Sequence, residues 1–294
     1  MERTKNKPQS ERQLAWKKRW YRFSRNYMSV SGLIIVAVVI IAAIFAQWIT
    51  PYPEHAGAFT DYTSANMAPS ASHIFGTDNI GRDIFTRVIF AFRNALKMAV
   101  IVLAISVPVG SVLGMIAGIR QGTWVDTVIM RFTDIFLSVP SMILALAIAS
   151  ILKPNMTNAM LAITVSWWPW YCRLAYGTAR SISRENYVRY AELTGGSFAH
   201  IVFREILPNC ISPILTKMTL DVGWVIMTGA SLSYIGLGEQ APTPALGNMI
   251  SAGIKYLPVQ WWNTVFPAIG IIVIILGFNL LGDGVSDLLA VEEE

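Results

Sequence analysis

Long apolar runs separated by polar segments dominate the pattern of this chain. Six runs carry few charged residues, at residues 30–49, 95–119, 125–152, 159–177, 211–236 and 262–281. A helix of about 20 apolar residues is long enough to cross the hydrocarbon core of a bilayer. The pattern therefore predicts an all-α membrane protein with six transmembrane helices.

The composition supports this interpretation. The chain of 294 residues is 54% hydrophobic and 14% charged, whereas a soluble domain has about 25% charged residues. Because the deficit of charge is concentrated in the apolar runs, a large soluble protein with buried helices is a poor alternative. The run at 30–49 and the basic segment before it are both too long for a cleavable signal peptide.

The positive charges give the expected orientation. The formal net charge is +5, and many basic residues lie before residue 26. These are Arg3, Lys5, Lys7, Arg12, Lys17, Lys18, Arg19, Arg22 and Arg25. Nucleic-acid binding is one interpretation of such a cluster, but a membrane span follows directly, so a positive-inside anchor is favoured. Six crossings then place both termini in the cytoplasm. Four cations depart from this rule, because they fall on the external side: Arg82, Arg87, Arg93 and Lys97.

These spans divide the chain into five parts. We expect a cytoplasmic basic segment at 1–29, a first transmembrane helix at 30–49 and an external loop at 50–94. The core at 95–285 then contains five transmembrane helices and a polar cytoplasmic loop at 178–209, and a cytoplasmic tail covers 286–294. A second external loop, at 239–260, contains Pro242, Pro244 and Gly247 and is a candidate for a re-entrant turn.

The polar loop at 187–209 is the most informative segment. Acidic and basic side chains alternate in it, which suits a protein groove better than an anionic lipid surface. The pair Gly195-Gly196 predicts a hinge between two short amphipathic pieces, and Pro208 is expected to end the second piece. From the residues alone, a docking site for a soluble partner and a solvated loop without a partner remain equally open.

Several motifs resemble one family of membrane proteins. The polar loop is similar to the Glu-Ala-Ala loop of ABC-importer permeases, with Gly195 and the ending Leu207-Pro208-Asn209 in place. Arg189-Tyr190-Ala191 stands at the Glu-Ala-Ala position, so its first two residues depart from the pattern, and Glu205 replaces an isoleucine. The external motif of Gly76, Thr77, Asp78, Gly81, Arg82 and Asp83 resembles GTDxxGRD of the dipeptide, oligopeptide and nickel importers, DppC/OppC type. The same subfamily is similar at 126–140, at 232–249, where Leu246 replaces a tryptophan, and at 278–287, where Ser286 replaces an arginine.

The resemblance implies a fold and a set of partners. It implies a type I ABC-importer permease that forms a translocation pathway for dipeptides, oligopeptides or similar solutes with a second homologous permease. Two cytoplasmic ATPases would bind ATP and Mg²⁺, an extracytoplasmic peptide-binding protein would deliver the solute, and no nucleic acid would take part. The implied location is the bacterial inner membrane. The implied ATPase-coupling residues are Arg189, Tyr190, Ala191, Glu192, Gly195, Gly196 and Ser197.

Two further groups of residues lie inside predicted spans. Asp221 and Lys217 are four residues apart on one helical face, and charges at membrane depth are often functional. A structural ion pair is favoured, and a contact with the solute in the pathway stays open. For Trp167, Trp168 and Trp170, an aromatic belt at the inner interface is favoured over a substrate pocket.

No residues point to catalysis by the chain itself. The sequence contains no G-x-x-x-x-G-K-[ST] phosphate loop. The scattered His55, His73 and His200 lack metal-ligand spacing, and Cys172 and Cys210 are expected to be reduced thiols. We therefore expect no catalytic residue, cofactor or metal in this chain. The alternatives to an ABC importer are a proton- or sodium-coupled secondary transporter, with Asp221 as its proton site, and a membrane scaffold that does not transport.

Overall fold

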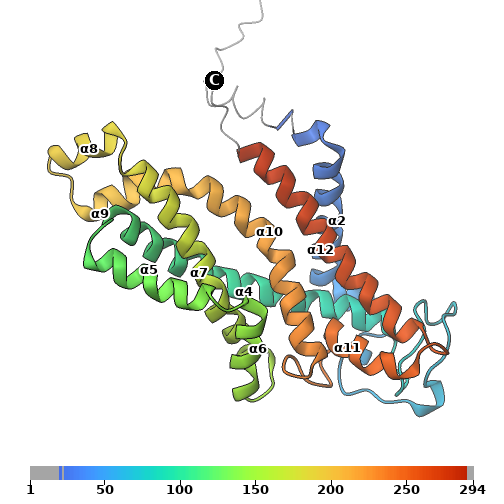
Figure 1. The fold of residues 1–294 in the computed structure, drawn as a ribbon. Helices are drawn as coiled ribbons and strands as arrows, with labels where there is room; N and C mark the ends of the chain where they lie inside the picture. The colour runs from blue at the N-terminus through green and yellow to red at the C-terminus, as the bar shows by residue number, and fades with distance from the viewer. Residues whose placement is uncertain (1–19, 22, 290–294) are drawn as a thin grey trace, which may run out of the picture.

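A computed structural model describes residues 20, 21 and 23–289, and the regular elements within them are helices (Figure 1). The longer helices are α2 (Tyr27–Ile44), α4 (Ile84–Ile119), α5 (Trp124–Leu137), α6 (Ser141–Ile151), α7 (Met156–Ile182), α8 (Asn186–Leu193), α10 (Leu207–Tyr234), α11 (Leu246–Gly253) and α12 (Trp262–Leu289). The shorter ones are α3 (Ala46–Ile49), η1 (Pro53–Ala56), η2 (Tyr62–Ser64), α9 (Phe198–His200), η3 (Ile201–Ile206) and η4 (Ile254–Tyr256). This all-α architecture is the predicted fold class.

Four helical stretches in the described residues are long and apolar enough to cross a membrane, namely α2, α4, Phe198–Tyr234 and α12. A fifth candidate is the pair α5 and α6, which bend by 84° at their junction. The segment predicted as one span at 125–152 is therefore not one continuous helix but two helices with a sharp bend between them. Pro140 forms the junction, because proline lacks a backbone N–H and restricts the residue before it.

Helix α7 contains 27 residues and is long enough for a bilayer, although it is not among the candidate spans. It packs closely along α4 through Gly110, Gly114 and Gly118, which are spaced four residues apart. A Cβ atom on any of the three would come within 3.0 Å of α7 backbone atoms. Such small-residue spacing lets two membrane helices approach closely, and it places α7 inside the bundle.

Helix boundaries differ from the predicted ones mainly at α4. This helix begins at Ile84 and not at residue 95, so it includes the last part of the predicted external loop. Its N-cap is Asp83, whose side chain accepts a hydrogen bond from the backbone N–H of Thr86 at 2.7 Å. Asp83 thereby satisfies one of the backbone N–H groups that the first turn of the helix leaves without a partner.

The two ends of the bundle carry different elements (Figure 1). The beginning of α2 and the end of α12 lie at the same end as α8 and α9, whereas residues 50–83 and α11 lie at the opposite end. Helices α2 and α12 run side by side, and α10 packs against both α12 and α7. The core between α4, α7 and α10 includes the fully buried Val102, Ile163 and Val225.

Candidate functional site

The segment after α7 leaves the bundle and returns to it at α10 (Figure 1). It contains α8, a turn at Gly195 with φ of +85°, and α9. Nothing lies within 4 Å of a Cβ placed at Gly195, so glycine serves the left-handed backbone there and not a close contact. The predicted break between two short helical pieces is thus present as a turn at Gly195. We call residues 183–206 the elbow.

Buried and polar contacts hold the elbow against the bundle. Val188 of α8 is completely buried, and α8 packs on η3. Asn209 donates a hydrogen bond to the hydroxyl of Tyr187 at 3.1 Å, so the start of α8 is tied to the start of α10. His200 Nε2 lies 3.2 Å from Glu205 Oε1, which gives Glu205 a partner within the elbow.

The turn between α4 and α5 also contacts the elbow. The guanidinium of Arg120 lies over the ring of Phe198, 4.8 Å from its centroid. Arg184 donates a hydrogen bond to Gln121 at 3.0 Å. A force on the elbow would therefore reach α4 and α5 as well as α7 and α10.

The helix that begins at Phe198 does not end at Pro208, so the prediction that Pro208 ends the second amphipathic piece is wrong. Residues 198–234 form one continuous helical stretch. Pro208 has no N–H to bond to the carbonyl of Arg204, and the turn before it widens into a π-helix, η3, where the Leu207 N–H bonds to the Val202 carbonyl. A π-helical turn accommodates such a break without ending the helix, so the elbow is joined rigidly to α10.

The outer surface of the elbow is exposed and mixed in character. Leu193 is 82% exposed and Tyr190 is 67% exposed, and Arg189 and Glu192 are exposed beside them. Gly196 and Ala191 are half-buried, whereas Ser197 is exposed and accepts a hydrogen bond from the His200 N–H. At the elbow's exit, Pro208 and Asn209 are exposed and Leu207 is half-buried. The predicted coupling residues thus form one accessible surface with apolar side chains at its tip.

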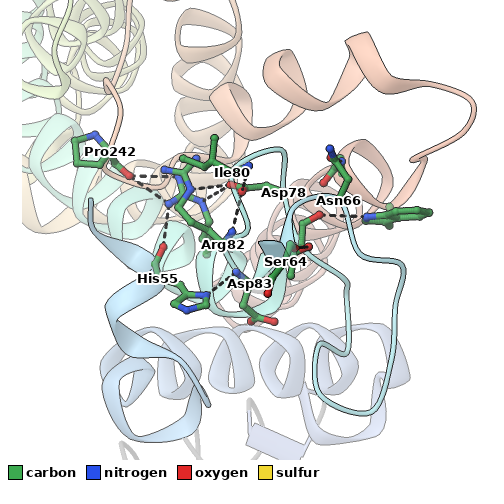
Figure 2. A network of polar contacts seen from close by, with 12 residues as sticks. His55, Ser64, Asn66, Asp78, Ile80, Arg82, Asp83 and Pro242 are labelled. Atoms are coloured by element: carbon green, nitrogen blue, oxygen red, sulfur yellow. Dashed lines mark hydrogen bonds and ion pairs between the residues drawn. The ribbon is translucent and has the colours of Figure 1, made fainter. Parts of the chain in front are cut away.

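The external motif folds into a compact polar network at the other end of the bundle (Figure 2). Asp78 accepts hydrogen bonds from the backbone of Ile80 at 3.0 Å and from both the backbone and the side chain of Arg82, at 2.9 and 2.7 Å. Thr77 donates to the Ser64 carbonyl at 2.5 Å. Gly81 has φ of +84°, and a Cβ there would overlap the carbonyl of Asp61. The motif is therefore an architectural element of the external loop.

Two histidines and a buried arginine complete this network, and the sequence did not mark them as site residues. His55 Nδ1 accepts a hydrogen bond from the Asp83 N–H at 2.8 Å, and His73 Nδ1 lies 2.9 Å from Asp83 Oδ1. Burial lowers the pKa of His55 below its ordinary value of 6.5. Arg87 donates to the carbonyls of His55, at 3.0 Å, and Pro242, at 3.3 Å, and thereby joins the segment at 50–83 to the loop at 235–245. The contact between Arg87 and Pro242 is visible only in the folded structure, because the two residues are far apart in the sequence.

The charged pair within the bundle lies between α7 and α10. Both oxygens of Asp221 lie 3.1 Å from the Lys217 ammonium. Trp167 donates a hydrogen bond to Asp221 at 3.1 Å. Because Trp167 is only 6% exposed, the prediction that it belongs to an interfacial aromatic belt is wrong. The ammonium also lies 5.7 Å from the ring centroid of Trp170 and 5.5 Å from that of Tyr171.

Within the described residues, no group of three His, Cys, Asp or Glu side chains is placed to hold a metal ion.

The chain is similar to known membrane transport proteins along most of its length. Residues 110–291 match the family described as binding-protein-dependent transport system inner membrane component, and residues 15–69 match the N-terminal TM domain of oligopeptide transport permease C. The chain is similar to a probable D,D-dipeptide transport system permease protein of Escherichia coli (strain K12), at 37% identity over 96% of this chain and 94% of the relative.

Other relatives are similar over nearly the same length. A dipeptide transport system permease protein of Alkalihalophilus pseudofirmus is 37% identical over 93% of this chain and 89% of that protein. A glutathione transport system permease protein of Escherichia coli O6:K15:H31 is 36% identical over the same shares. The family match covers more than half of the chain, and the relatives align along almost all of it. This chain therefore belongs to the family of binding-protein-dependent transport system inner membrane components, the membrane permeases of ABC importers.

Proposed function

We propose that this chain forms, with a second homologous permease, the translocation pathway of an ATP-driven importer of short peptides in the bacterial inner membrane. The substrate class is supported by the relatives, which are named for dipeptide, D,D-dipeptide and glutathione transport. A soluble peptide-binding protein delivers the solute at the external end. Two cytoplasmic ATPases bind ATP and Mg²⁺, because the sequence carries no phosphate-binding loop of its own.

The topology that fits this function has six spans: α2, α4, the bent pair of α5 and α6, α7, α10 and α12. With an N-terminus in the cytoplasm, this count places the elbow and both chain ends on the cytoplasmic side. Two observations support it: the elbow lies at the same end as the start of α2 and the end of α12, and the basic cluster precedes α2.

The exposed elbow is the observation that carries the proposal. It projects from the bundle with Tyr190 and Leu193 largely exposed, yet it is rigidly continuous with α10 and tied to the turn between α4 and α5. A docking ATPase would move the elbow, and the elbow would transmit this motion to the helices. ATP binding would then shift the equilibrium between inward-open and outward-open states, because the ATPases bind the elbows differently in the two states.

For Asp221 and Lys217 we propose a structural role in joining α7 and α10, in preference to contact with the solute. Asp221 is 4% exposed, and its carboxylate is already occupied by Lys217 and Trp167. A carboxylate that contacted the solute would need an open position on the pathway side.

Reconstitution tests the proposal directly. The chain would be purified with its co-expressed permease and ATPases, placed in vesicles with ATP inside, and supplied with radiolabelled dipeptide and binding protein outside. We expect dipeptide uptake that requires ATP and the binding protein. Uptake that continues without ATP and stops on addition of an ionophore would instead identify a secondary transporter. Purification without any ATPase partner would contradict the proposal.

A further inference from the structure

Two cations on α4 lie more than 4.0 Å from every acidic group that the structure describes. Arg93 and Lys97 lie four residues apart, so they occupy one face of the helix. Both side chains are exposed. Charges on a membrane-spanning helix are costly unless they are paired or reach a polar surface, and they commonly mark a functional position. These two are therefore available to bind an anionic group.

The cations stand at one end of an apolar groove with a volume of about 750 Å³. Its walls come from α2, α4, α10 and α12, with Ile40, Val100 and Phe278 among the lining side chains. Every other side chain in the lining is also apolar. Along α4 the groove extends from Arg93 to Ala104, a length of about 16 Å at 1.5 Å per residue. The groove is therefore charged at one end, where the two cations lie, and apolar along the rest of its length.

The depth of the cations fits the headgroup level of a bilayer. Helix α4 has 36 residues and is about 54 Å long, whereas the hydrocarbon core is about 30 Å thick. If Ile119 lies at one boundary of that core, the other boundary lies near residue 99. Lys97 and Arg93 then reach the polar interface beside the external loop, and the groove between them and Ala104 extends into the acyl chains.

We propose that this groove binds an anionic phospholipid, with the phosphate held by Arg93 and Lys97 and one acyl chain lying along α4. A molecule with a negative head and a long apolar tail matches the division of polarity. A peptide fits less well, because its backbone amides would be buried where the lining offers no hydrogen-bond partner apart from the two cations. Basic sites between membrane helices are suited to anionic headgroups.

Lipid retention by the purified assembly tests the site. The intact complex would be equilibrated in nanodiscs that contain equal amounts of phosphatidylglycerol and phosphatidylethanolamine, then extracted and analysed by native mass spectrometry. We expect phosphatidylglycerol to be retained preferentially. Arg93→Gln and Lys97→Gln should each lower the ratio of retained phosphatidylglycerol to phosphatidylethanolamine about fivefold. Lys153→Gln, which removes an exposed cation outside the groove, should leave the ratio unchanged.

Two further measurements separate the tail from the head and the lipid from a protein. Ala104→Phe narrows the groove and keeps both cations, so phosphatidylglycerol retention should fall; undiminished retention would overturn the placement of the acyl chain. A photoreactive residue at Val100 should crosslink to lipid. A crosslink from Val100 to another subunit, or equal retention by the wild type and the Arg93→Gln, Lys97→Gln double variant, would overturn the proposal.

Discussion

The indole of Trp167 in α7 donates a hydrogen bond of 3.1 Å to the carboxylate of Asp221 in α10. These residues are 54 positions apart in the sequence, and both are almost completely buried. The bond places a carboxylate between two helices that flank the elbow on either side. Lys217, one turn earlier on α10, pairs with the same carboxylate and lies over the rings of Trp170 and Tyr171. The pair on α10 therefore contacts α7 through one hydrogen bond and two cation–π contacts.

Replacing Asp221 with asparagine should destabilise the protein. The variant leaves the Lys217 ammonium without its carboxylate. Because the Lys217 side chain is 29% exposed, the cost should be about 1–3 kcal/mol, below the value of about 3–5 kcal/mol for a fully buried pair. The thermal unfolding midpoint of the purified assembly measures this loss. Substituting both partners, with Lys217→Met and Asp221→Leu, should recover most of the stability, because no unpaired charge then remains.

The same double variant separates the structural role from a role in the pathway. If the pair only joins the helices, the double variant should import dipeptide at close to the wild-type rate. Normal assembly with lost uptake would show instead that Asp221 contacts the solute.

Two glycine-to-alanine substitutions, one on α4 and one on α7, should have different effects on the stability of the protein. Gly114→Ala would bring a Cβ within 3.0 Å of the α7 backbone, which should cost about 1–3 kcal/mol of stability. Gly177→Ala in α7 meets nothing within 4 Å and should be neutral, or stabilising by up to about 1 kcal/mol. Thermal unfolding of both variants tests this difference. Equal midpoints would mean that α4 and α7 are farther apart than described.

Local sequence signals predicted much of the architecture. Apolar length located α2, α10 and α12 closely, because a membrane helix must satisfy its backbone within itself. The break between two short helical pieces at Gly195 was also predicted, since such a turn depends on a few neighbouring residues. The spacing of Gly110, Gly114 and Gly118 was equally legible in the sequence, but it was not used.

Features that depend on distant partners were missed. Tryptophan is typical of membrane interfaces, so the sequence favoured an interfacial position for Trp167. Its actual partner, Asp221, lies on another helix and could not be identified from neighbouring residues. Arg87 appeared to be an external cation that violates the charge rule, whereas it bonds to the Pro242 carbonyl, 155 positions away. The bend between α5 and α6 was not predicted, because hydropathy averaged over many residues does not register the single Pro140. Proline by itself does indicate a break in a helix.

The external network should weaken as the medium becomes acidic. Burial lowers the pKa of His55 in the folded state, and His55 Nδ1 must be unprotonated to accept the Asp83 N–H. Glu54, Asp83, Asp78 and His73 also act on this imidazole. A depressed histidine pKa stabilises the fold above the unfolded-state pKa, near 6.5, and this contribution is lost as the pH falls below it.

Limited proteolysis of the external loop at pH 7.5 and pH 5.5 tests this dependence. The wild-type loop should be cut faster at the lower pH, after correction for protease activity. His55→Gln retains an acceptor for the Asp83 N–H but does not titrate, so its cleavage rate should change less with pH. An identical pH dependence in the two proteins would exclude His55 as the responsible group.

The exposed tip of the elbow should contribute directly to ATPase binding. Leu193 is 82% exposed, and burial of a leucine side chain in a partner's groove is worth about 1.5–3 kcal/mol. Leu193→Asp should therefore weaken the ATPase–permease complex by at least about tenfold. Val259→Asp is the control, because Val259 is 78% exposed but lies in the external loop before α12. Titration of the purified ATPase into permease nanodiscs measures the affinity of both variants. Equal losses of affinity would contradict a specific contribution of the elbow to ATPase binding.

Substitution of Gly195 should uncouple ATP hydrolysis from uptake without unfolding the bundle. Valine is sterically excluded from a φ of +85°, so Gly195→Val would force the turn between α8 and α9 into another conformation. Asparagine tolerates the left-handed region, and the site has open space for its side chain, so Gly195→Asn is the matched control. We expect the ratio of dipeptide imported to ATP hydrolysed to fall at least severalfold in the valine variant and to stay near the wild-type value in the asparagine variant. Normal coupling in Gly195→Val would show that the elbow transmits motion without its left-handed turn.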